Sequence, residues 1–466
     1  MSAAPTAEPR LNAVLARIDA TLPDMLERLK ALLRIPSIST DPARAADCRR
    51  AAAHLRDDLA SMGFDASLRD TAGHPMVVAH SPRRGGRRVL FYGHYDVQPV
   101  DPLELWDRPP FDPAVEDTPR GPVIRGRGAC DDKGQLMTFV EAFRAWREVH
   151  GELPGDITIL LEGEEESGSP SLDAFLAAHR DELGLDLAVI CDTDLAPDGR
   201  PAITTQLRGL VGEEVILRGA DRDLHSGLFG GLAANPVQVL VAALATIRDA
   251  DGRVTLEGFY DGVPELSNQL RADWEGLGFD AGAFLGRVGL RHPAGERGRS
   301  GLELIWARPT FEINGISGGY TGEGFKTVLP AEARAKVSFR LTGRQDPEAV
   351  RAAFRARIRA LVPADCGVEF HPHGGSPAAQ MDISDPVFLK ARRALAEEWG
   401  REAAYVGSGG SIPIAQAFKE ALGMDSLLIG FGRDDDRVHS PNEKYDVESF
   451  HKGTRSWARV IAALQG

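Results

Sequence analysis

Short apolar runs alternate with amphipathic segments through the first half of the chain, and this alternation restricts the possible folds most. The apolar runs predict buried strands over 88–93, 156–161 and 186–190. Apolar residues at three- and four-residue spacing predict helices over 11–33, 41–62, 133–149 and 171–179. Strand–helix–strand alternation predicts an α/β fold with a mostly parallel sheet and helices on both faces.

The pattern changes at about Gly209 and returns after Asp382. Between these points the chain suggests a small sheet with two helices on one face. Its predicted elements are strands over 213–217, 334–341 and 367–371, a helix capped by Asn235 and a helix over 347–361. Residues 251–320, rich in Gly, Pro and charge, give no clear assignment. A helix over 386–399 and a strand over 426–430 then resume the first pattern. We therefore predict a catalytic domain in two parts, 1–207 and 383–466, interrupted by an inserted α+β domain, 208–382.

Composition excludes several classes of protein. The formal net charge is −14, from 68 acidic and 54 basic side chains, which argues against a nucleic-acid binder. The four cysteines lie far apart without a CxxC pair, which is typical of a reducing cytoplasm. No apolar stretch approaches the roughly 20 residues that span a membrane, and the N-terminus lacks the apolar core of a signal peptide. We expect a cytoplasmic protein without nucleic-acid or membrane partners.

Polar segments follow or flank the predicted strands. They are 91–96 with His94, 126–134 with Asp131, 161–169 with Glu164, Glu165 and Glu166, 189–193 with Asp192, and 433–442 with His439. In an open parallel sheet, ligand sites form at the carboxyl ends of the strands. We therefore expect these five segments to converge.

Converging imidazoles and carboxylates point to metal ions, because closely packed like charges repel one another. If one carboxylate bridges two divalent ions, one histidine and one further carboxylate remain for each. Mixed nitrogen and oxygen donors suit zinc, manganese or cobalt better than calcium or magnesium. Two ions about 3.5–4 Å apart activate a shared water and polarise a carbonyl, while a carboxylate off the metals serves as general base.

Each segment also has a simpler explanation. His94 and His439 taken singly suit ordinary loop histidines. Three successive glutamates usually form a solvated helix start, and Asp131, Asp132 and Asp192 suit helix caps. Their joint placement at strand ends favours the metal site.

The same residues also resemble a known family, the dinuclear metallopeptidases that include cytosolic non-specific dipeptidase, carnosinase, aminoacylase and glutamate carboxypeptidase. The matching blocks are Gly-His-Tyr-Asp-Val-Gln-Pro from Gly93, Arg-Gly-x-x-Asp-Asp-Lys-Gly from Arg127, Glu-Glu-Ser-Gly-Ser from Glu165, Asp-Leu-His-Ser-Gly from Asp223, Gly-Gly-Ser-Ile-Pro from Gly409 and His-Ser-Pro-Asn-Glu from His439. The blocks span about residues 90–445 in order, and they are most similar to the dipeptidase branch. Cys130 departs from the pattern, which has a small polar residue there.

This resemblance implies a role for each site residue. Asp131 bridges two divalent ions, with zinc preferred over manganese or cobalt. His94 and Asp192 complete one ion, and Glu166 and His439 complete the other. Glu165 is the general base, and Asp96 orients the His94 imidazole. A cis peptide is implied at Asp131-Asp132.

The resemblance also implies that the inserted domain is a lid and dimerisation domain of a homodimer. His225 then reaches into the partner subunit's active site and stabilises the oxyanion. Thr327, Arg340 and Ser411 hold the backbone or carboxylate of a small peptide, for which a guanidinium fork is suited.

Two other functions remain open from the sequence. A deacylase of N-acyl or N-carbamoyl amino acids shares every predicted metal ligand, so only its specificity pocket differs. A non-catalytic peptide-binding relative predicts missing ligands, and none is missing from this chain. The favoured function is metal-dependent hydrolysis of an amide bond in a dipeptide or other small peptide.

Overall fold

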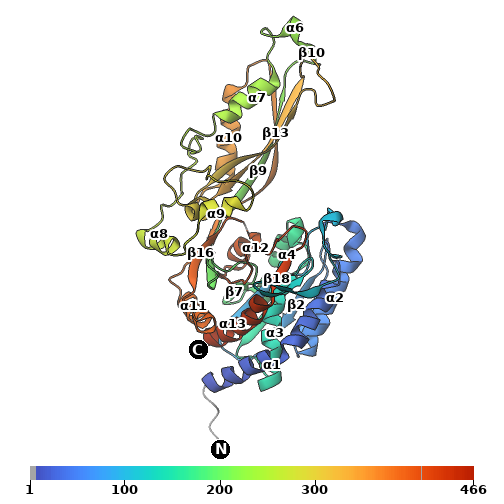
Figure 1. Ribbon diagram of the computed structural model, residues 1–466, viewed down its shortest axis with the longest axis vertical. Coiled ribbons are helices and arrows are strands. Elements are labelled where there is room, and N and C mark those ends of the chain that lie inside the picture. Colours follow the sequence, from blue (N-terminus) through green and yellow to red (C-terminus); the bar gives the residue numbers. More distant parts are fainter. Residues whose placement is uncertain (1–6, 411, 466) are drawn as a thin grey trace, which may run out of the picture. The chain divides into compact units, whose positions relative to one another are not determined.

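Parallel strands form the centre of the first of the two units into which this computed structural model divides (Figure 1). Residues 7–410 and 412–465 are described. The first unit runs to Thr205 and resumes over Met381–Val406 and from Ala417 onward, whereas the second comprises Gln206–Gln380 and Gly407–Gln416. The segment Gly407–Gln416, which sequence analysis placed in the catalytic domain, thus has its contacts mainly with the second unit.

The main sheet has the strand order β1-β2-β6-β3-β7-β17-β8-β15, with β16 pairing β8. Its strands are β1 (Asp65–Arg69), β2 (Met76–His80), β3 (Arg88–His94), β6 (Asp156–Glu162), β7 (Leu187–Ile190), β8 (Ala202–Leu207), β15 (Ala379–Gln380), β16 (Ala404–Ser408) and β17 (Ser426–Leu428). The central pairs β6–β3, β3–β7 and β7–β17 are parallel, whereas β1–β2, β2–β6 and β8–β17 are antiparallel. The predicted mostly parallel sheet is confirmed.

Helices cover both faces of this sheet. They are α1 (Ala7–Leu33), α2 (Ala45–Ser61), α3 (Lys133–His150), α4 (Leu172–Ala178), α5 (Arg180–Leu183), α11 (Pro386–Trp399) and α13 (Val447–Gln465), with the π-helical turn η5 (Phe418–Leu422). The short helix α12 (Pro413–Ala417) lies almost entirely in the Gly407–Gln416 segment of the second unit. Phe91 of β3 packs against α3 and against Trp457 of α13, whereas the next residue, Tyr92, meets Phe418 of η5. Successive side chains of a strand point to opposite faces, so helical segments lie on each. Within the described part of the chain, no helix is long and apolar enough to cross a membrane.

A smaller three-stranded sheet lies in the same unit and joins distant parts of the chain. Its strands are β4 (Ala114–Thr118), β5 (Gly121–Arg125) and β18 (Lys444–Asp446), in the order β18-β5-β4. The antiparallel pairing of β18 with β5 brings the segment after His439 beside the segment before Asp131. Two of the predicted site segments are therefore joined through this sheet.

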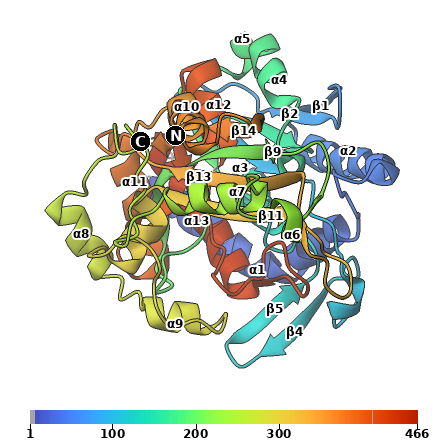
Figure 2. The same cartoon turned by 90° about the horizontal axis from the view of Figure 1, so that it is seen from above.

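The second unit is an antiparallel sheet with two helices along one face (Figures 1 and 2). Its strands are β9 (Gly209–Arg218), β11 (Thr310–Gly318), β13 (Glu332–Leu341) and β14 (Gly367–Ser376), in the order β11-β13-β9-β14. The helices are α7 (Pro236–Ala245) and α10 (Pro347–Leu361). Asn235 caps α7 as predicted, because its side chain accepts the N–H of Val237 at 3.0 Å.

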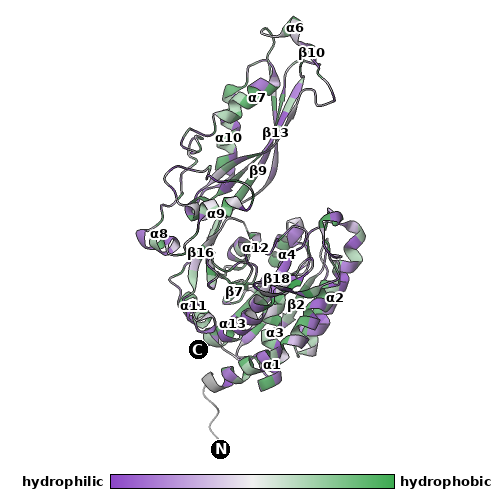
Figure 3. Ribbon diagram, viewed as in Figure 1, coloured by the Kyte–Doolittle hydropathy of each residue, from purple (hydrophilic) through white to green (hydrophobic). Residues whose placement is uncertain are grey.

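The core of this unit forms between the sheet and α7 and α10. Buried and exposed residues alternate along β13, as expected for a strand with one covered face. Hydrophobic residues dominate α7 (Figure 3), and Leu240 packs in one cluster with Val215, Phe339 and Phe354. The remaining elements are β10 (Leu224–His225), β12 (Val328–Leu329), α6 (Ser226–Phe229), α8 (Asn268–Glu275), α9 (Ala281–Gly286) and the π-helical turn η4 (Glu303–Ala307).

Candidate metal centre and active site

His94 ends β3 and lies buried at the carboxyl edge of the parallel sheet. A Cβ on the preceding residue, Gly93, would approach Asp132 Oδ2 to 2.8 Å and Leu136 Cβ to 2.9 Å, so glycine lets β3 approach the start of α3 closely. Asp132 precedes α3 without a side-chain capping bond and instead accepts the backbone N–H of His94 at 3.0 Å. The backbone before His94 is therefore tied to the α3 start, next to Asp131.

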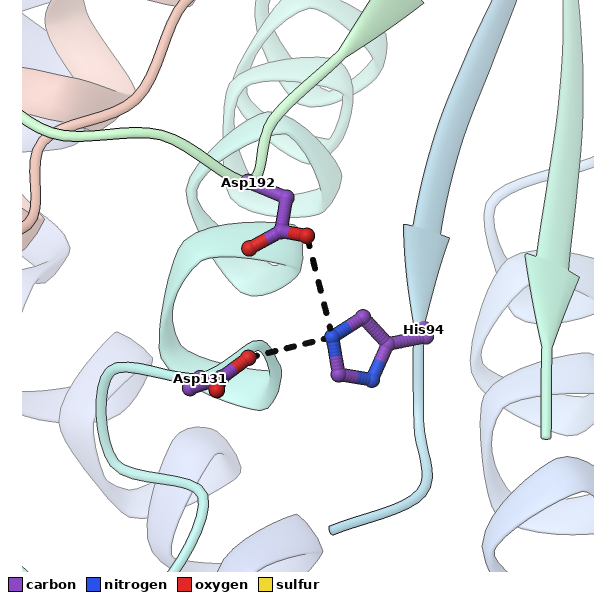
Figure 4. Close-up of side chains that lie close together, drawn as sticks. All are labelled: His94, Asp131 and Asp192. Carbon is purple, nitrogen blue, oxygen red and sulfur yellow. Dashed lines mark hydrogen bonds and ion pairs between the residues drawn. The ribbon is translucent and has the colours of Figure 1, made fainter. Parts of the chain in front are cut away.

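The five predicted ligands form two groups that share Asp131. One group is His94, Asp131 and Asp192, and the other is Asp131, Glu166 and His439; in each group the possible ligand atoms lie within 4.8 Å of one another. Figure 4 shows the carboxylates of both aspartates of the first group facing the same ring nitrogen of His94. The convergence expected from the strand ends is present.

Asp131 presents one carboxylate oxygen to each histidine. Its Oδ1 lies 3.1 Å from His94 Nε2, and its Oδ2 lies 2.9 Å from His439 Nε2. Asp192 Oδ2 lies 4.0 Å from His94 Nε2, and Glu166 Oε2 lies 3.1 Å from His439 Nε2. Each group thus offers one imidazole nitrogen, one carboxylate that belongs to that group alone, and one oxygen of the shared Asp131 carboxylate. This donor set fits a pair of divalent ions of the zinc, manganese or cobalt type.

Asp96 belongs to neither ligand group but contacts one ligand of each. His94 Nδ1 lies 3.2 Å from the Asp96 backbone oxygen and 3.4 Å from its Oδ1. Asp96 Oδ2 accepts the backbone N–H of Glu166 at 3.0 Å. Gln98 adds a second support, because its Nε2 donates to Glu166 Oε2 at 2.7 Å. Asp96 therefore has the geometry to orient one ligand of each group.

Glu165 begins the 3₁₀ turn η3 (Glu165–Ser167) and belongs to neither ligand group. Burial raises the pKa of Glu165 to about 8; the charge of His94 acts in the opposite direction, and the charges of Asp192 and Glu166 add to the increase. A half-buried carboxylate beside two ligand groups has the placement of a general base.

Cys130, the departure from the family pattern, is buried and contributes no atom to either ligand group. Burial raises the pKa of its thiol well above the usual value. A Cβ on Gly432 would lie 3.2 Å from its sulfur, so the side chain packs against the chain just after β17. Cys130 is therefore a packed core thiol, and the peptide after the next residue, Asp131-Asp132, is cis as the resemblance implies.

The carboxylates hold protons on both histidines. Hydrogen bonds to Asp131 and then Glu166 raise the pKa of His439 to about 10. Burial acts to lower the pKa of His94, but hydrogen bonds to Asp131 and Asp96 outweigh it and raise this pKa well above its usual value. Burial, followed by the charge of Asp131, raises the pKa of Asp192 to about 7.

We therefore expect metal binding to release protons. A metal ligand must be a neutral imidazole or an ionised carboxylate, so both histidines lose protons when ions bind at neutral pH. Metal affinity should rise as the pH increases from about 7 toward 10. Calorimetric titration at about pH 7.5 in buffers of different ionisation enthalpy measures the effect, with more than one proton released per chain. A binding heat independent of the buffer would contradict the protonated state of the two histidines.

Of the residues predicted to bind substrate, the structure brings His225 and Thr327 together. The Thr327 backbone oxygen accepts the N–H of Ser226 at 3.1 Å, and β10 pairs with β12. The His225 ring is exposed, and its Nδ1 accepts the N–H of Gly227 at 3.0 Å. In a neutral ring this bond leaves the proton on Nε2, which becomes a donor. Arg340 lies on β13 opposite Leu210 and Thr310, whereas Ser411 lies outside the described residues.

Sequence reasoning gave Gln98 and Glu443 no role, and it considered Asp132 only as a possible helix cap, a capping bond that its side chain does not make. All three stand inside the family-like sequence blocks, so their positions were a usable signal. Their contacts are mainly to backbone groups far along the chain, which no spacing rule reveals.

Known proteins resemble this chain along almost its whole length. Residues 90–463 match the sequence profile of peptidase family M20/M25/M40. The chain is 29% identical over 478 residues to the Cys-Gly metallodipeptidase DUG1 of Saccharomyces cerevisiae, covering 97% of each chain. It is 30% identical over 469 residues to human Beta-Ala-His dipeptidase, covering 98% of this chain and 86% of that one. Among solved structures, an M20 family metallo-carboxypeptidase from Sulfolobus solfataricus superposes with a TM-score of 0.83 at 29% identity, covering 95% and 99% of the two chains.

Proposed function

The chain belongs to peptidase family M20/M25/M40, and on that premise we propose that it is a metal-dependent dipeptidase. The observation that carries this proposal is Asp131, whose two oxygens each contact one histidine of a separate ligand group. The relatives named as dipeptidases support a two-residue substrate and do not favour the deacylase alternative. A non-catalytic binding protein is disfavoured because all five predicted ligands are gathered.

We propose zinc as the native metal, with manganese and cobalt as alternatives, held by the two groups around Asp131. Such ions, when bound, would polarise the scissile carbonyl and lower the pKa of the attacking water. Glu165 accepts a proton from the attacking water and returns it to the leaving amine nitrogen. Asp96 keeps the His94 ring oriented, and Gln98 keeps the Glu166 carboxylate in place.

The second unit supplies the proposed substrate contacts. In the proposed dimer, the Nε2–H of His225 from one subunit is a donor for the oxyanion of the tetrahedral intermediate in the active site of the other subunit. Arg340, with Thr327 and Ser411, holds the substrate's carboxylate or backbone. Burial lowers the pKa of Arg340, yet a guanidinium remains charged at neutral pH and binds a carboxylate through two parallel hydrogen bonds.

We further propose a homodimer formed through the second unit, 206–380, as its lid and dimerisation domain. Large apolar side chains are exposed there, among them Phe325 at 90% and Leu232 at 85%, which is typical of an interaction surface. The strands β11 and β14 are the two edge strands of the antiparallel sheet. Sedimentation velocity should give twice the chain mass for the wild type. The double variant Leu232→Asp, Phe325→Asp should instead give the mass of the monomer. A monomeric wild-type chain would refute this proposal.

A cytoplasmic location is also proposed. The four cysteines are free, and Cys48, Cys130 and Cys191 are buried, which suits a reducing compartment. Fractionation of the source cells, followed by immunodetection, would place the protein.

The choice of substrate is tested by comparing three groups of compounds. Dipeptides with a free carboxylate should be hydrolysed, whereas dipeptide amides should show a KM raised about tenfold or more, because a lost charge-assisted hydrogen bond costs about 1.5–3 kcal/mol. N-acetyl amino acids should be cleaved poorly. Efficient cleavage of N-acetyl or N-carbamoyl amino acids with no dipeptide hydrolysis would instead support the deacylase.

A further inference from the structure

The Glu443 carboxylate is fully buried and fixes the loop that carries Asp131. Its Oε1 accepts the backbone N–H groups of Cys130 at 2.9 Å and Asp131 at 3.0 Å. Its Oε2 accepts the backbone N–H of Gly128 at 3.0 Å and Arg127 Nη1 at 2.8 Å. Both oxygens therefore have two donors each, and one of these donors belongs to the shared ligand itself.

Glu443 is itself held in place through its backbone. Its carbonyl oxygen accepts the N–H of Gly126 at 3.0 Å, and the preceding carbonyl, of Asn442, accepts Arg125 Nη1 at 2.7 Å. The next residues form β18, which pairs with β5. Since His439 lies four residues before Glu443, this segment joins the loop of His439 to the loop of Asp131.

Neutralising Arg127 is the simpler role for Glu443, because a buried ion pair needs both partners. The Arg127–Glu443 pair is indeed almost fully buried, with 2% and 0% of the side chains exposed. Arg127, however, accounts for one of the four hydrogen bonds. The other three come from backbone N–H groups within residues 128–131, a concave set of donors of the kind that binds anions.

We propose that Glu443 is a positioning residue of the metal centre: its carboxylate occupies an anion site in the 128–131 loop and sets the position of Asp131 relative to His439. This rests on the metal-dependent function proposed above. Without that carboxylate, three N–H donors and a buried guanidinium lose their acceptor. The Asp131 oxygens then lose their fixed distances to His94 and His439, so the affinity for both ions falls.

The test measures Mn²⁺ binding to the full-length Glu443→Ala variant by titration followed with electron paramagnetic resonance. We expect an affinity about 10- to 100-fold weaker than in the wild type, the usual effect of removing a residue that supports metal ligands. Glu213→Ala is the matched control, since Glu213 is equally buried and pairs with Arg351 and Arg355 in the second unit. It should bind Mn²⁺ as the wild type does, even if its Tm falls.

Chemical rescue separates positioning from general destabilisation. Formate or acetate fills the anion site left by Glu443→Ala and should restore part of the Mn²⁺ affinity, whereas acetamide at the same concentration should not. If Glu443→Ala does not fold, Glu443→Gln keeps the side-chain shape and should still weaken Mn²⁺ binding, because its amide N–H groups face two donors.

Wild-type Mn²⁺ affinity in a folded Glu443 variant would overturn the proposal, as would an equal loss in Glu213→Ala. A wild-type chain that binds no Mn²⁺, Zn²⁺ or Co²⁺ would instead refute the metal-dependent function itself. The two failures are therefore distinguishable.

Discussion

Replacing Glu165 by glutamine lowers kcat for dipeptide hydrolysis by about 10²–10⁴-fold, the usual contribution of a positioned general base. Glutamine keeps the shape of the side chain but cannot accept a proton. Because Glu165 belongs to neither ligand group, the variant should still bind two metal ions, with KM changed little. Steady-state kinetics together with elemental analysis of the same preparation measures both effects.

Glu164→Gln is the control for the assignment within the run of three glutamates. Glu164 is buried and belongs to neither ligand group, and its backbone oxygen accepts the N–H groups of Ser167 and Ser169. That backbone contact survives the substitution, so kcat should stay within a few-fold of the wild type. A large loss of kcat in Glu164→Gln, together with an active Glu165→Gln, would show that Glu164 and not Glu165 is the general base.

Asp131→Asn should abolish activity by removing both metal ions. Asparagine keeps one oxygen where the carboxylate presents two. It also loses the negative charge that attracts the two imidazoles, whose Nε2 atoms lie 3.1 Å (His94) and 2.9 Å (His439) from the Asp131 oxygens. Losing metal-ion catalysis removes several kcal/mol of transition-state stabilisation, so kcat/KM should fall by at least about 10³-fold.

Asp192→Asn is the matched comparison for that variant, because Asp192 belongs to one ligand group alone. The Asp192→Asn substitution should weaken the binding of one metal ion more than the binding of the other. Metal content after dialysis therefore distinguishes the two variants: near zero for Asp131→Asn, and about one ion per chain for Asp192→Asn. Two ions retained in Asp131→Asn would exclude the bridging role.

The parallel core of the first unit was predictable, because β3, β6 and β7 are buried on both faces and so appear as continuous apolar runs. The strand β11 was not predicted. It is an edge strand with Phe311 as its buried residue and with glycines at Gly315 and Gly318, so it lacks the alternation that marks a half-buried strand. The hairpin of β4 and β5 was missed for the same reason, since its side chains are mostly half-exposed.

The candidate site was predictable where its residues follow strands. His94 ends β3, and Asp192 follows β7 by two residues, so the geometry of a parallel sheet places them together. The supporting contacts were not predictable, because Glu443 reaches Asp131 across 312 residues through a backbone N–H. Contacts of that kind depend on the register of β18 against β5, which the sequence pattern does not specify.

Metal content, measured together with dipeptide hydrolysis before and after chelation, tests the central claim most directly. We predict about two divalent ions per chain, loss of hydrolysis on chelation, and its return when zinc, manganese or cobalt is added. A chain that binds no metal and hydrolyses no dipeptide after each of these ions is supplied would contradict the claim.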